Sequence, residues 1–264
     1  MKGEATLSAG MEATAVMRKL AIVPAYNEEG SVARVVAGLH EHVPDFDVLV
    51  VDDGSTDRTS AEAERSGATV LRHPFNLGIG GAVQSGYKYA LAHGYDVAIQ
   101  VDGDGQHDPS FIPRLVEELT ANGSVDMVCG TRFREGAGYR VPRSRRLGIM
   151  FFSVILSRLV GERITDPTSG FRLTGRRAIE LFASDYPHDY PEVEVLLMLH
   201  KHDLRMREVP VSMNERISGR SSITNTLSGY YMVKVLLALL VGITRKRRAV
   251  KPGGAAPVSA QRGI

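Results

Sequence analysis

The sequence predicts an α/β protein built on a mostly parallel, twisted β-sheet with helices on both faces. Short apolar runs of four to six residues alternate with longer segments in which apolar residues recur at helical spacing. Polar or glycine-containing turns end each run. Strands that alternate with helices are joined by right-handed crossovers and therefore lie parallel. With 264 residues, of which 43% are hydrophobic, the chain can bury a substantial core.

Four strand–helix units follow one another from residue 20. The first strand, 20–25, precedes a helix whose apolar stripe is Val32, Val35, Val36 and Leu39. Three further units and a fifth strand continue the pattern. Their strands are predicted at 48–51, 68–71, 97–101 and from 127, and their helices at 60–65, 79–92 and 110–121.

Acidic pairs follow two of the predicted strands. Asp52 and Asp53 end the second strand, and Asp102 and Asp104 end the fourth. Ligands of such sheets gather beyond the carboxyl ends of the strands. Two carboxylates one residue apart, beside glycines that let the backbone turn, suit Mg²⁺ or Mn²⁺, with a solvated Asp/Gly turn as the alternative. Asp53 is also placed to accept hydrogen bonds from a nucleobase or a ribose hydroxyl.

Two further turns carry polar or glycine residues that suit a binding site. Gly78 opens a predicted helix, so its backbone amide could meet a phosphate, although tight helix packing explains such a glycine equally well. The segment 166–172 reads Asp-Pro-Thr-Ser-Gly-Phe-Arg and is either a functional loop or a simple turn. Six arginines within 132–146 form either a solvated basic face or a site for an anion such as phosphate.

Composition narrows the classes of protein. Lys and Arg number 32 against 30 Asp and Glu, and this near-balance argues against a general nucleic-acid-binding protein. The single cysteine, Cys129, excludes an intrachain disulfide and fits a reducing cytosol. Residues 1–18 hold no continuous apolar segment, so we expect a flexible tail rather than a signal peptide.

Two apolar stretches point to a membrane surface. Residues 147–160 and 230–243 are each about fourteen residues long, and a bilayer span needs roughly 20. Both fit interfacial amphipathic helices, although core burial remains open for the first. We therefore expect a catalytic domain over 19–223, an amphipathic, membrane-associated helix over 224–244 and a basic tail over 245–264.

Six segments in register resemble family-two glycosyltransferases, of the type that includes dolichyl- and polyprenyl-phosphate sugar synthases. They are residues 23–28, 51–57, 76–78, 102–107, 166–172 and 208–210. The resemblance covers roughly residues 19–223. It implies a glycosyltransferase A-type fold, a nucleotide-diphospho-sugar donor, a Mg²⁺ or Mn²⁺ cofactor and inversion at the anomeric carbon.

The same resemblance assigns roles to individual residues. The nucleotide-sugar-binding set is Pro24, Tyr26, Glu28, Asp53, Gly78, Asp102 and Arg216. The metal ligands are Asp102, Asp104 and Gln106. The acceptor-binding set is Arg132, Arg143, Arg145, Arg146, Thr168 and Ser169. The catalytic set is Asp102, Asp104, Arg132, Glu192 and Glu194, the last two as bases for a hydroxyl acceptor.

These inferences predict a glycosyltransferase that acts peripherally at the cytoplasmic face of a membrane on a lipid-linked acceptor, with a polyprenyl phosphate favoured. A phosphate monoester is already anionic at neutral pH and needs no strong base, whereas a sugar hydroxyl of a glycan or glycolipid does. Both acceptors stay open. A nucleotidyltransferase and a non-catalytic sugar-nucleotide-binding protein are weaker alternatives, and a homo-oligomer is not excluded.

Overall fold

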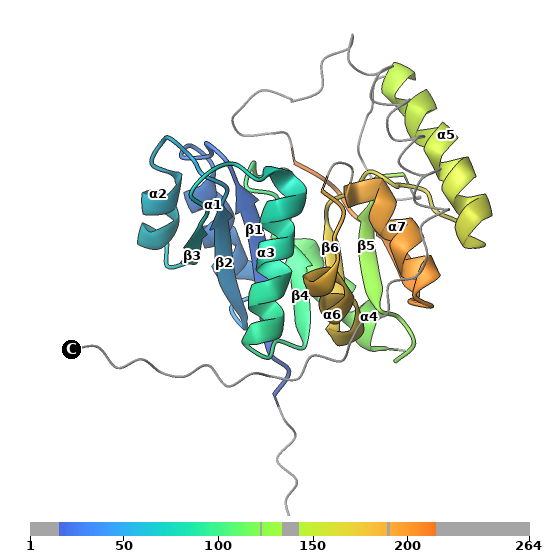
Figure 1. Cartoon of the computed structure of the whole chain (residues 1–264), viewed down its shortest axis with the longest axis horizontal. Coiled ribbons are helices and arrows are strands. Elements are labelled where there is room, and N and C mark those ends of the chain that lie inside the picture. Colours follow the sequence, from blue (N-terminus) through green and yellow to red (C-terminus); the bar gives the residue numbers. More distant parts are fainter. Residues whose placement is uncertain (1–15, 122, 134–142, 189–190, 215–264) are drawn as a thin grey trace, which may run out of the picture.

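The computed structural model describes residues 16–121, 123–133, 143–188 and 191–214. These residues form one sheet with the strand order β3-β2-β1-β4-β6-β5-β7 (Figure 1). The strands are β1 Lys19–Ala25, β2 Phe46–Asp52, β3 Thr69–Arg72, β4 Val97–Gln100, β5 Met127–Thr131, β6 Arg172–Gly175 and β7 Met206–Pro210. All neighbouring strands pair in parallel except β6, which is antiparallel to both β4 and β5. The predicted mostly parallel sheet is confirmed.

The helices of the described residues fill the connections between the strands. They are α1 Val32–His42, α2 Thr59–Arg65, α3 Gly78–Ala92, α4 Ile112–Thr120, α5 Arg143–Val160, α6 Arg176–Ser184 and α7 Pro191–Lys201. A 3-10 turn, Pro109–Phe111, precedes α4. The predicted strands and helices up to residue 127 are confirmed, and their ends differ from the prediction by at most two residues.

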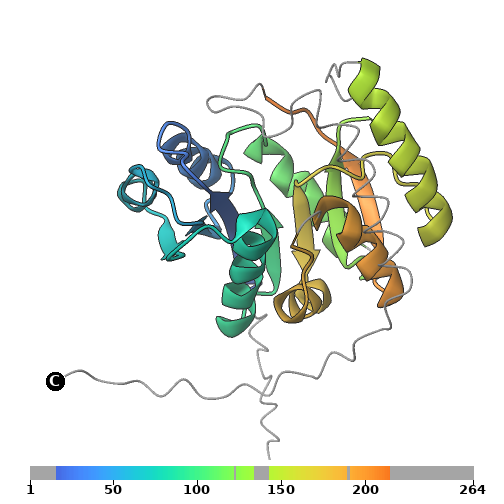
Figure 2. The same cartoon turned by 45° about the horizontal axis from the view of Figure 1, so that its top comes forward.

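Two cores cover the two faces of the sheet. Successive β1 residues alternate between them: Leu20 and Ile22 pack in the core beneath α3, α5, α6 and α7, while Ala21 and Val23 pack in the core beneath α1 and α4. Figures 1 and 2 show α3 and α6 in front of the sheet and α4 behind it. Because both faces are buried, β1, β2 and β4 are mostly apolar.

The reversed strand β6 decides where the loop before it lies. Arg172, its first residue, pairs with Gln100 at the carboxyl end of β4 and with Cys129 of β5. The preceding residues, 166–171, therefore lie beyond the sheet edge at which β1, β2 and β4 end. The motifs around residues 102 and 166 consequently share one edge.

Helix α5 contains the first of the two predicted amphipathic stretches. Its Phe152 and Leu156 are buried in the core, whereas Met150, Phe151 and Val154 are about half exposed. The helix thus has a core face and an apolar solvent face. No helix among the described residues is long and apolar enough to cross a bilayer. The second stretch, 230–243, and the predicted boundaries after residue 214 lie outside the described residues.

Candidate active site

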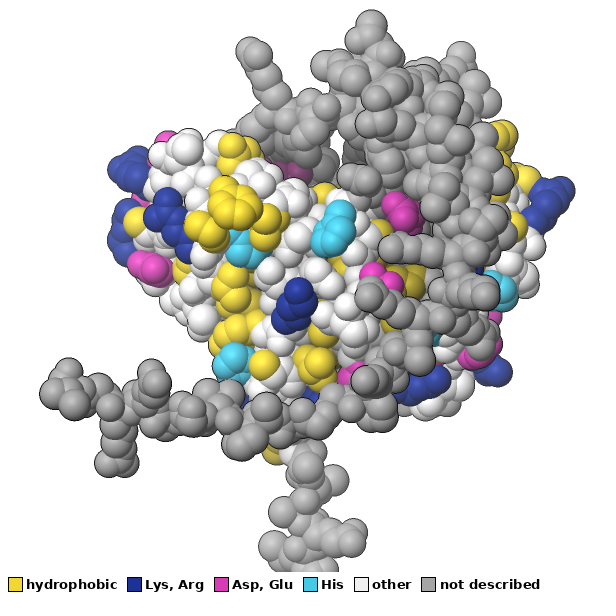
Figure 3. Space-filling view, in the orientation of Figure 1, with side chains coloured by type: hydrophobic (Ala, Val, Ile, Leu, Met, Phe, Trp, Pro, Cys, Tyr) yellow, Lys and Arg dark blue, Asp and Glu magenta, His cyan; other side chains and the backbone are white. Residues whose placement is uncertain are grey.

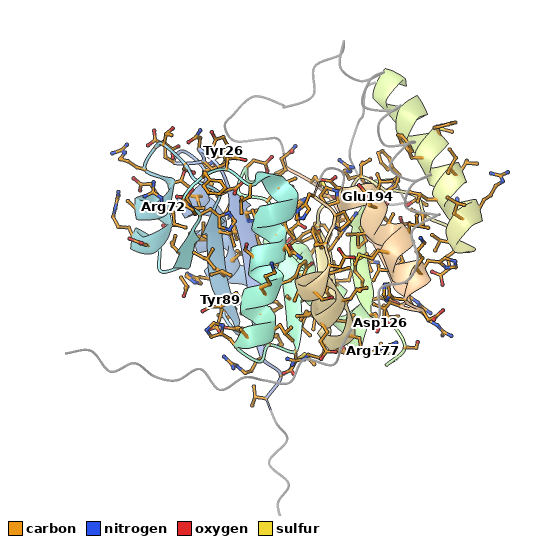
Figure 4. The ribbon with its side chains drawn as sticks, in the orientation of Figure 1. Tyr26, Arg72, Tyr89, Asp126, Arg177 and Glu194 are labelled. Carbon is orange, nitrogen blue, oxygen red and sulfur yellow. The ribbon has the colours of Figure 1, made fainter. Side chains whose placement is uncertain are left out.

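The carboxyl ends of β1, β2 and β4 bring three predicted motifs together. The backbone amide of Asp53 donates to the carbonyl oxygen of Ala25, at 2.9 Å. A Cβ atom added to Gly103 would lie 3.1 Å from the carbonyl oxygen of Pro24, so the acidic turn packs directly on the end of β1. Figure 4 shows Tyr26 at this end of the sheet, opposite Asp126 and Arg177.

Hydrogen bonds between two loops fix the turn that follows β1. Asn27 adopts a left-handed conformation, and its backbone amide donates to the Ser55 hydroxyl at 2.9 Å. The Glu28 amide donates to Thr59 Oγ1 at 2.8 Å, and the Glu28 carboxylate accepts from Ser31 Oγ at 2.6 Å. The turn holds Tyr26 in the open, with 48% of its surface exposed, beyond the buried Pro24.

Asp53 is buried and orders the start of α3. Its Oδ1 lies 2.7 Å from Nδ1 of His73 and accepts from the Leu77 amide at 2.9 Å. Its Oδ2 accepts from the Gly78 amide at 2.8 Å. The carboxylate therefore caps the helix N-terminus at which a donor phosphate was predicted. Contact between Asp53 and a nucleobase stays a prediction.

The predicted metal-binding turn contains one open and one enclosed carboxylate. Asp102 is about one-third exposed, and its Oδ1 accepts from Gln100 Nε2 at 3.1 Å. Asp104 is buried, and its Oδ1 accepts from the Gln106 amide at 3.0 Å. Within the described part of the chain, no three His, Cys, Asp or Glu side chains converge on one point. The residues fit a hard cation that completes its shell with substrate oxygens and water, as Mg²⁺ commonly does.

His107 supports this turn and was not predicted as a site residue. Its Nδ1 accepts from the Asp102 backbone amide at 3.0 Å, and its ring stacks on Phe171 with centroids 4.8 Å apart. A backbone bridge joins it to Met213. The side chain lies inside the motif that the sequence identified, but neither its ring stacking nor its backbone partner has a sequence signal.

Arg132 and the loop before β6 form the acceptor side of the predicted site. Arg132 is buried and donates to Asp166 through Nε at 2.7 Å and through Nη2 at 2.8 Å. Nη2 also donates to Thr168 Oγ1 at 2.8 Å. The structure thus brings Arg132 and Thr168 together around Asp166. Ser169 is buried beside them.

Several predicted arginines lie outside the described side chains. Arg143, Arg145 and Arg146 belong to the first turn of α5, which begins at Arg143, but their side chains are not described. Arg216 lies outside the described residues altogether. Their predicted contacts with donor or acceptor stay predictions.

A fully buried arginine joins the loop before β6 to the start of α7. Arg172 donates to the carbonyl oxygens of Ser169, at 2.8 Å, and of Pro191 and Glu192. Burial raises the pKa of the Glu192 carboxyl; the positive charge of Arg172 opposes that shift and the negative charge of Asp102 adds to it. Glu192 therefore lies near the acidic turn. Glu194, two residues further along α7, is partly exposed (Figure 4).

Comparison with known proteins identifies the family to which the chain belongs. The profile described as Glycosyl transferase family 2 matches residues 20–182. Undecaprenyl-phosphate mannosyltransferase of Micrococcus luteus is 34% identical over 83% of this chain and 93% of that protein. Polyprenol monophosphomannose synthase of Mycolicibacterium smegmatis is 30% identical over 88% of this chain and 92% of that protein.

A solved structure shares the fold. Glucosyl-3-phosphoglycerate synthase from Mycobacterium tuberculosis, in complex with Mn²⁺, UDP and phosphoglyceric acid, matches with a TM-score of 0.69 and 22% identity, covering 88% of this chain and 81% of that one. The expected glycosyltransferase architecture is therefore confirmed. By the family profile and the extent of these relatives, the chain is a glycosyltransferase and belongs to glycosyltransferase family 2.

Proposed function

We propose that the chain is a metal-dependent, inverting glycosyltransferase that transfers a sugar from a nucleotide-diphospho-sugar to a polyprenyl phosphate. The observation that carries the acceptor is a mainly apolar cavity of about 460 Å³ beside the Arg132 cluster. Its lining includes Met150 and Val154 of α5, together with Arg158 and Arg163. Phe133 and Thr165, the sequence neighbours of Arg132 and Asp166, also line it. A lipid phosphate bound near Arg132 would place its first hydrocarbon units against this lining.

The relatives support the same acceptor class. The names of the two bacterial relatives specify undecaprenyl phosphate and polyprenol monophosphomannose. A UDP-N-acetylglucosamine–dolichyl-phosphate N-acetylglucosaminyltransferase of Methanococcus voltae is 30% identical over 84% of this chain. These proteins differ in sugar but share a polyprenyl carrier, so the acceptor is the property that we carry over to this chain.

The charges of the predicted site residues suggest how each group of the two substrates would be bound. Asp102, Asp104 and Gln106 would hold Mg²⁺ or Mn²⁺, which supplies Lewis acidity for the departing nucleoside diphosphate. Asp53 accepts from the Leu77 and Gly78 amides and so fixes the turn at the start of α3, beside the proposed donor site. Arg132 orients the acceptor phosphate, whose oxygen is already anionic and attacks the anomeric carbon opposite the leaving group. This geometry inverts the anomeric configuration.

A transfer assay tests the proposal. Purified protein is incubated with a panel of labelled nucleotide sugars, undecaprenyl phosphate and Mn²⁺, and the organic phase is scored for labelled lipid. We expect one donor to label the lipid, and chelator and Asp104→Asn each to abolish the labelling. Asp108→Asn is the matched control, because Asp108 lies in the same turn but accepts from the Ser110 amide at 3.0 Å. Full transfer in chelator would exclude metal dependence.

A sugar hydroxyl is the second candidate acceptor, and Glu192 is the observation that favours it. Its raised pKa makes it a stronger base when ionised, and it lies near Asp102. Glu192→Gln separates the two acceptors. Transfer to a phosphate should survive this change, whereas transfer to a hydroxyl should fall by about 100-fold or more.

We also propose that the protein binds the cytoplasmic face of a membrane through the exposed face of α5. Flotation with anionic liposomes compares the full chain with Phe151→Glu and Val154→Glu, which we expect to float less. Phe75→Glu is the control, since Phe75 is 64% exposed over the start of α3, where hydrophobic side chains gather in Figure 3. Equal flotation of all variants would argue against α5 as the membrane contact.

A further inference from the structure

Glu208 of β7 is a buried carboxylate outside the predicted site residues. It accepts from the Thr165 amide at 2.8 Å (Oε1) and 3.0 Å (Oε2), and from the Asp166 amide at 3.0 Å. The Thr165 hydroxyl donates a further bond at 2.7 Å. All of these donors belong to the loop before β6. The Glu208 carboxylate therefore holds two consecutive loop residues, Thr165 and Asp166, through their backbone amides and the Thr165 hydroxyl.

The loop that Glu208 holds carries the carboxylate that binds Arg132. Asp166 follows Thr165 directly and accepts from two nitrogens of the Arg132 guanidinium and from the Arg132 backbone amide, at 3.2 Å. Bidentate arginine–carboxylate bonds fix the plane of the guanidinium. An unbroken series of charge-assisted hydrogen bonds therefore runs from β7 through the loop to the end of β5.

The side-chain bonds of Glu208 are not needed to join β5 to β7. β5 and β7 already pair in parallel from Met127 opposite Met206 to Thr131 opposite Pro210. The Glu208 side chain instead holds a loop outside the sheet. Its neighbour Arg207 faces the other way and binds Glu118 at the surface, at 2.8 Å.

We propose that Glu208 is a positioning residue for the acceptor: it fixes Asp166, and Asp166 sets the orientation of the Arg132 guanidinium. The inference rests on the proposed polyprenyl-phosphate transfer for its kinetic consequence, but its structural consequence is independent of any acceptor. In this proposal Glu208 acts on the acceptor through the loop and Asp166 rather than by direct contact.

Glu208→Gln in the full chain is the primary test. The amide keeps the size of the side chain but replaces one accepting oxygen by a donor, which faces the donors of the loop. We expect the KM for undecaprenyl phosphate to rise about tenfold, equivalent to about 1.4 kcal/mol of lost binding. The KM for the donor and the rate of donor hydrolysis without acceptor should stay near those of the natural protein. Arg207→Gln is the control and should change neither KM.

A double-mutant cycle and a spectrum identify the route of the effect. If Glu208 acts through Arg132, the two substitutions should not act independently. The fold increase in acceptor KM of the double variant, Glu208→Gln with Arg132→Lys, should then be far smaller than the product of the fold increases of the two single variants. The arginine Nε–H resonance of Arg132, assigned by its loss in Arg132→Lys, should shift in Glu208→Gln. Thr165→Val removes the hydroxyl bond to Glu208 and the bond of the same hydroxyl to Thr131 Oγ1, but keeps both backbone bonds to Glu208. It should give a milder form of the same changes if Glu208→Gln folds poorly.

The outcomes separate the two proposals. An unshifted Arg132 resonance, equal rises in both KM values or additive effects in the cycle would overturn the role of Glu208. A natural protein that hydrolyses donor but labels no polyprenyl phosphate would overturn the proposed function instead, and the resonance would still decide whether Glu208 positions Arg132.

Discussion

Gly170 lies against the predicted metal-binding carboxylate, and Gly170→Ala tests whether that contact controls activity. A Cβ atom at this position would lie 3.1 Å from Gln100 Nε2 and 3.4 Å from each carboxylate oxygen of Asp102. Ordinary methyl contacts begin at 3.4 Å, so Gln100 must yield by a few tenths of an ångström. Gln100 in turn donates to Asp102 at 3.1 Å, and the displacement passes to that carboxylate.

The size of the effect follows from these distances. Metal–ligand distances tolerate about 0.2 Å, and a 1 Å misplacement at a reacting centre can cost about 100-fold in rate. We therefore expect the turnover of donor to fall about tenfold and the Mn²⁺ concentration for half-maximal rate to rise. Because only one methyl group is added at a partly exposed loop, the free energy of unfolding should change by less than about 1 kcal/mol.

The assay compares initial rates over a series of Mn²⁺ concentrations, with thermal melting in parallel. Gly175→Ala is the matched control, because its added Cβ meets nothing closer than 3.7 Å at the end of the same segment. Natural rates and unchanged Mn²⁺ dependence in Gly170→Ala would contradict the prediction that the Gly170–Gln100–Asp102 contact controls metal binding. An equal loss in Gly175→Ala would point to general destabilisation.

Three further predictions concern groups that folding removes wholly or partly from water. Asp53→Asn removes one of the oxygens that cap α3, so we expect unfolding to become about 1–2 kcal/mol easier in thermal melts and the donor KM to rise; an unchanged melt would refute the cap. Cys129 is buried and burial raises its pKa to about 11, so the thiol should resist alkylation at pH 8 until guanidinium unfolds the chain; rapid native labelling would contradict this. Burial raises the pKa of Glu192, so folding favours its protonated form and stability is lost as pH rises above the ordinary value of 4.5. Glu192→Gln should therefore melt higher than the natural protein at pH 8 but not at pH 4, and an equal difference at both pH values would refute the shift.

The first half of the fold was predictable from the sequence because each of its strands contains a short apolar run. β2 reads Phe-Asp-Val-Leu-Val-Val-Asp and is buried on both faces, so the run itself identifies the strand. The last two strands, β6 and β7, carry no such signal. β6 is the four residues Arg172–Gly175, whose arginine is buried by tertiary contacts, and β7 has exposed Arg207 beside buried Glu208.

The candidate site was likewise predictable only in part. Acidic residues after β2 and β4 were predictable because the carboxyl ends of parallel strands meet at one edge. The pairing of Arg132 with Asp166 was not, because the two residues are 34 positions apart and only the reversal of β6 brings them together. The role of Asp53 as a helix cap likewise depends on the approach of the Leu77–Gly78 backbone, which leaves no pattern in the sequence.

The insertion of β6 between β4 and β5 also constrains the order of folding. β4 can pair with β1 before the rest of the chain is available, but its other edge has no partner until residues 172–175 have been synthesised. Through that interval the nascent chain exposes an apolar strand edge, the kind of surface that promotes mispairing and aggregation. Because β5 reaches the sheet only through β6, we expect the part of the sheet formed by β3, β2, β1 and β4 to fold before β6, β5 and β7 complete it.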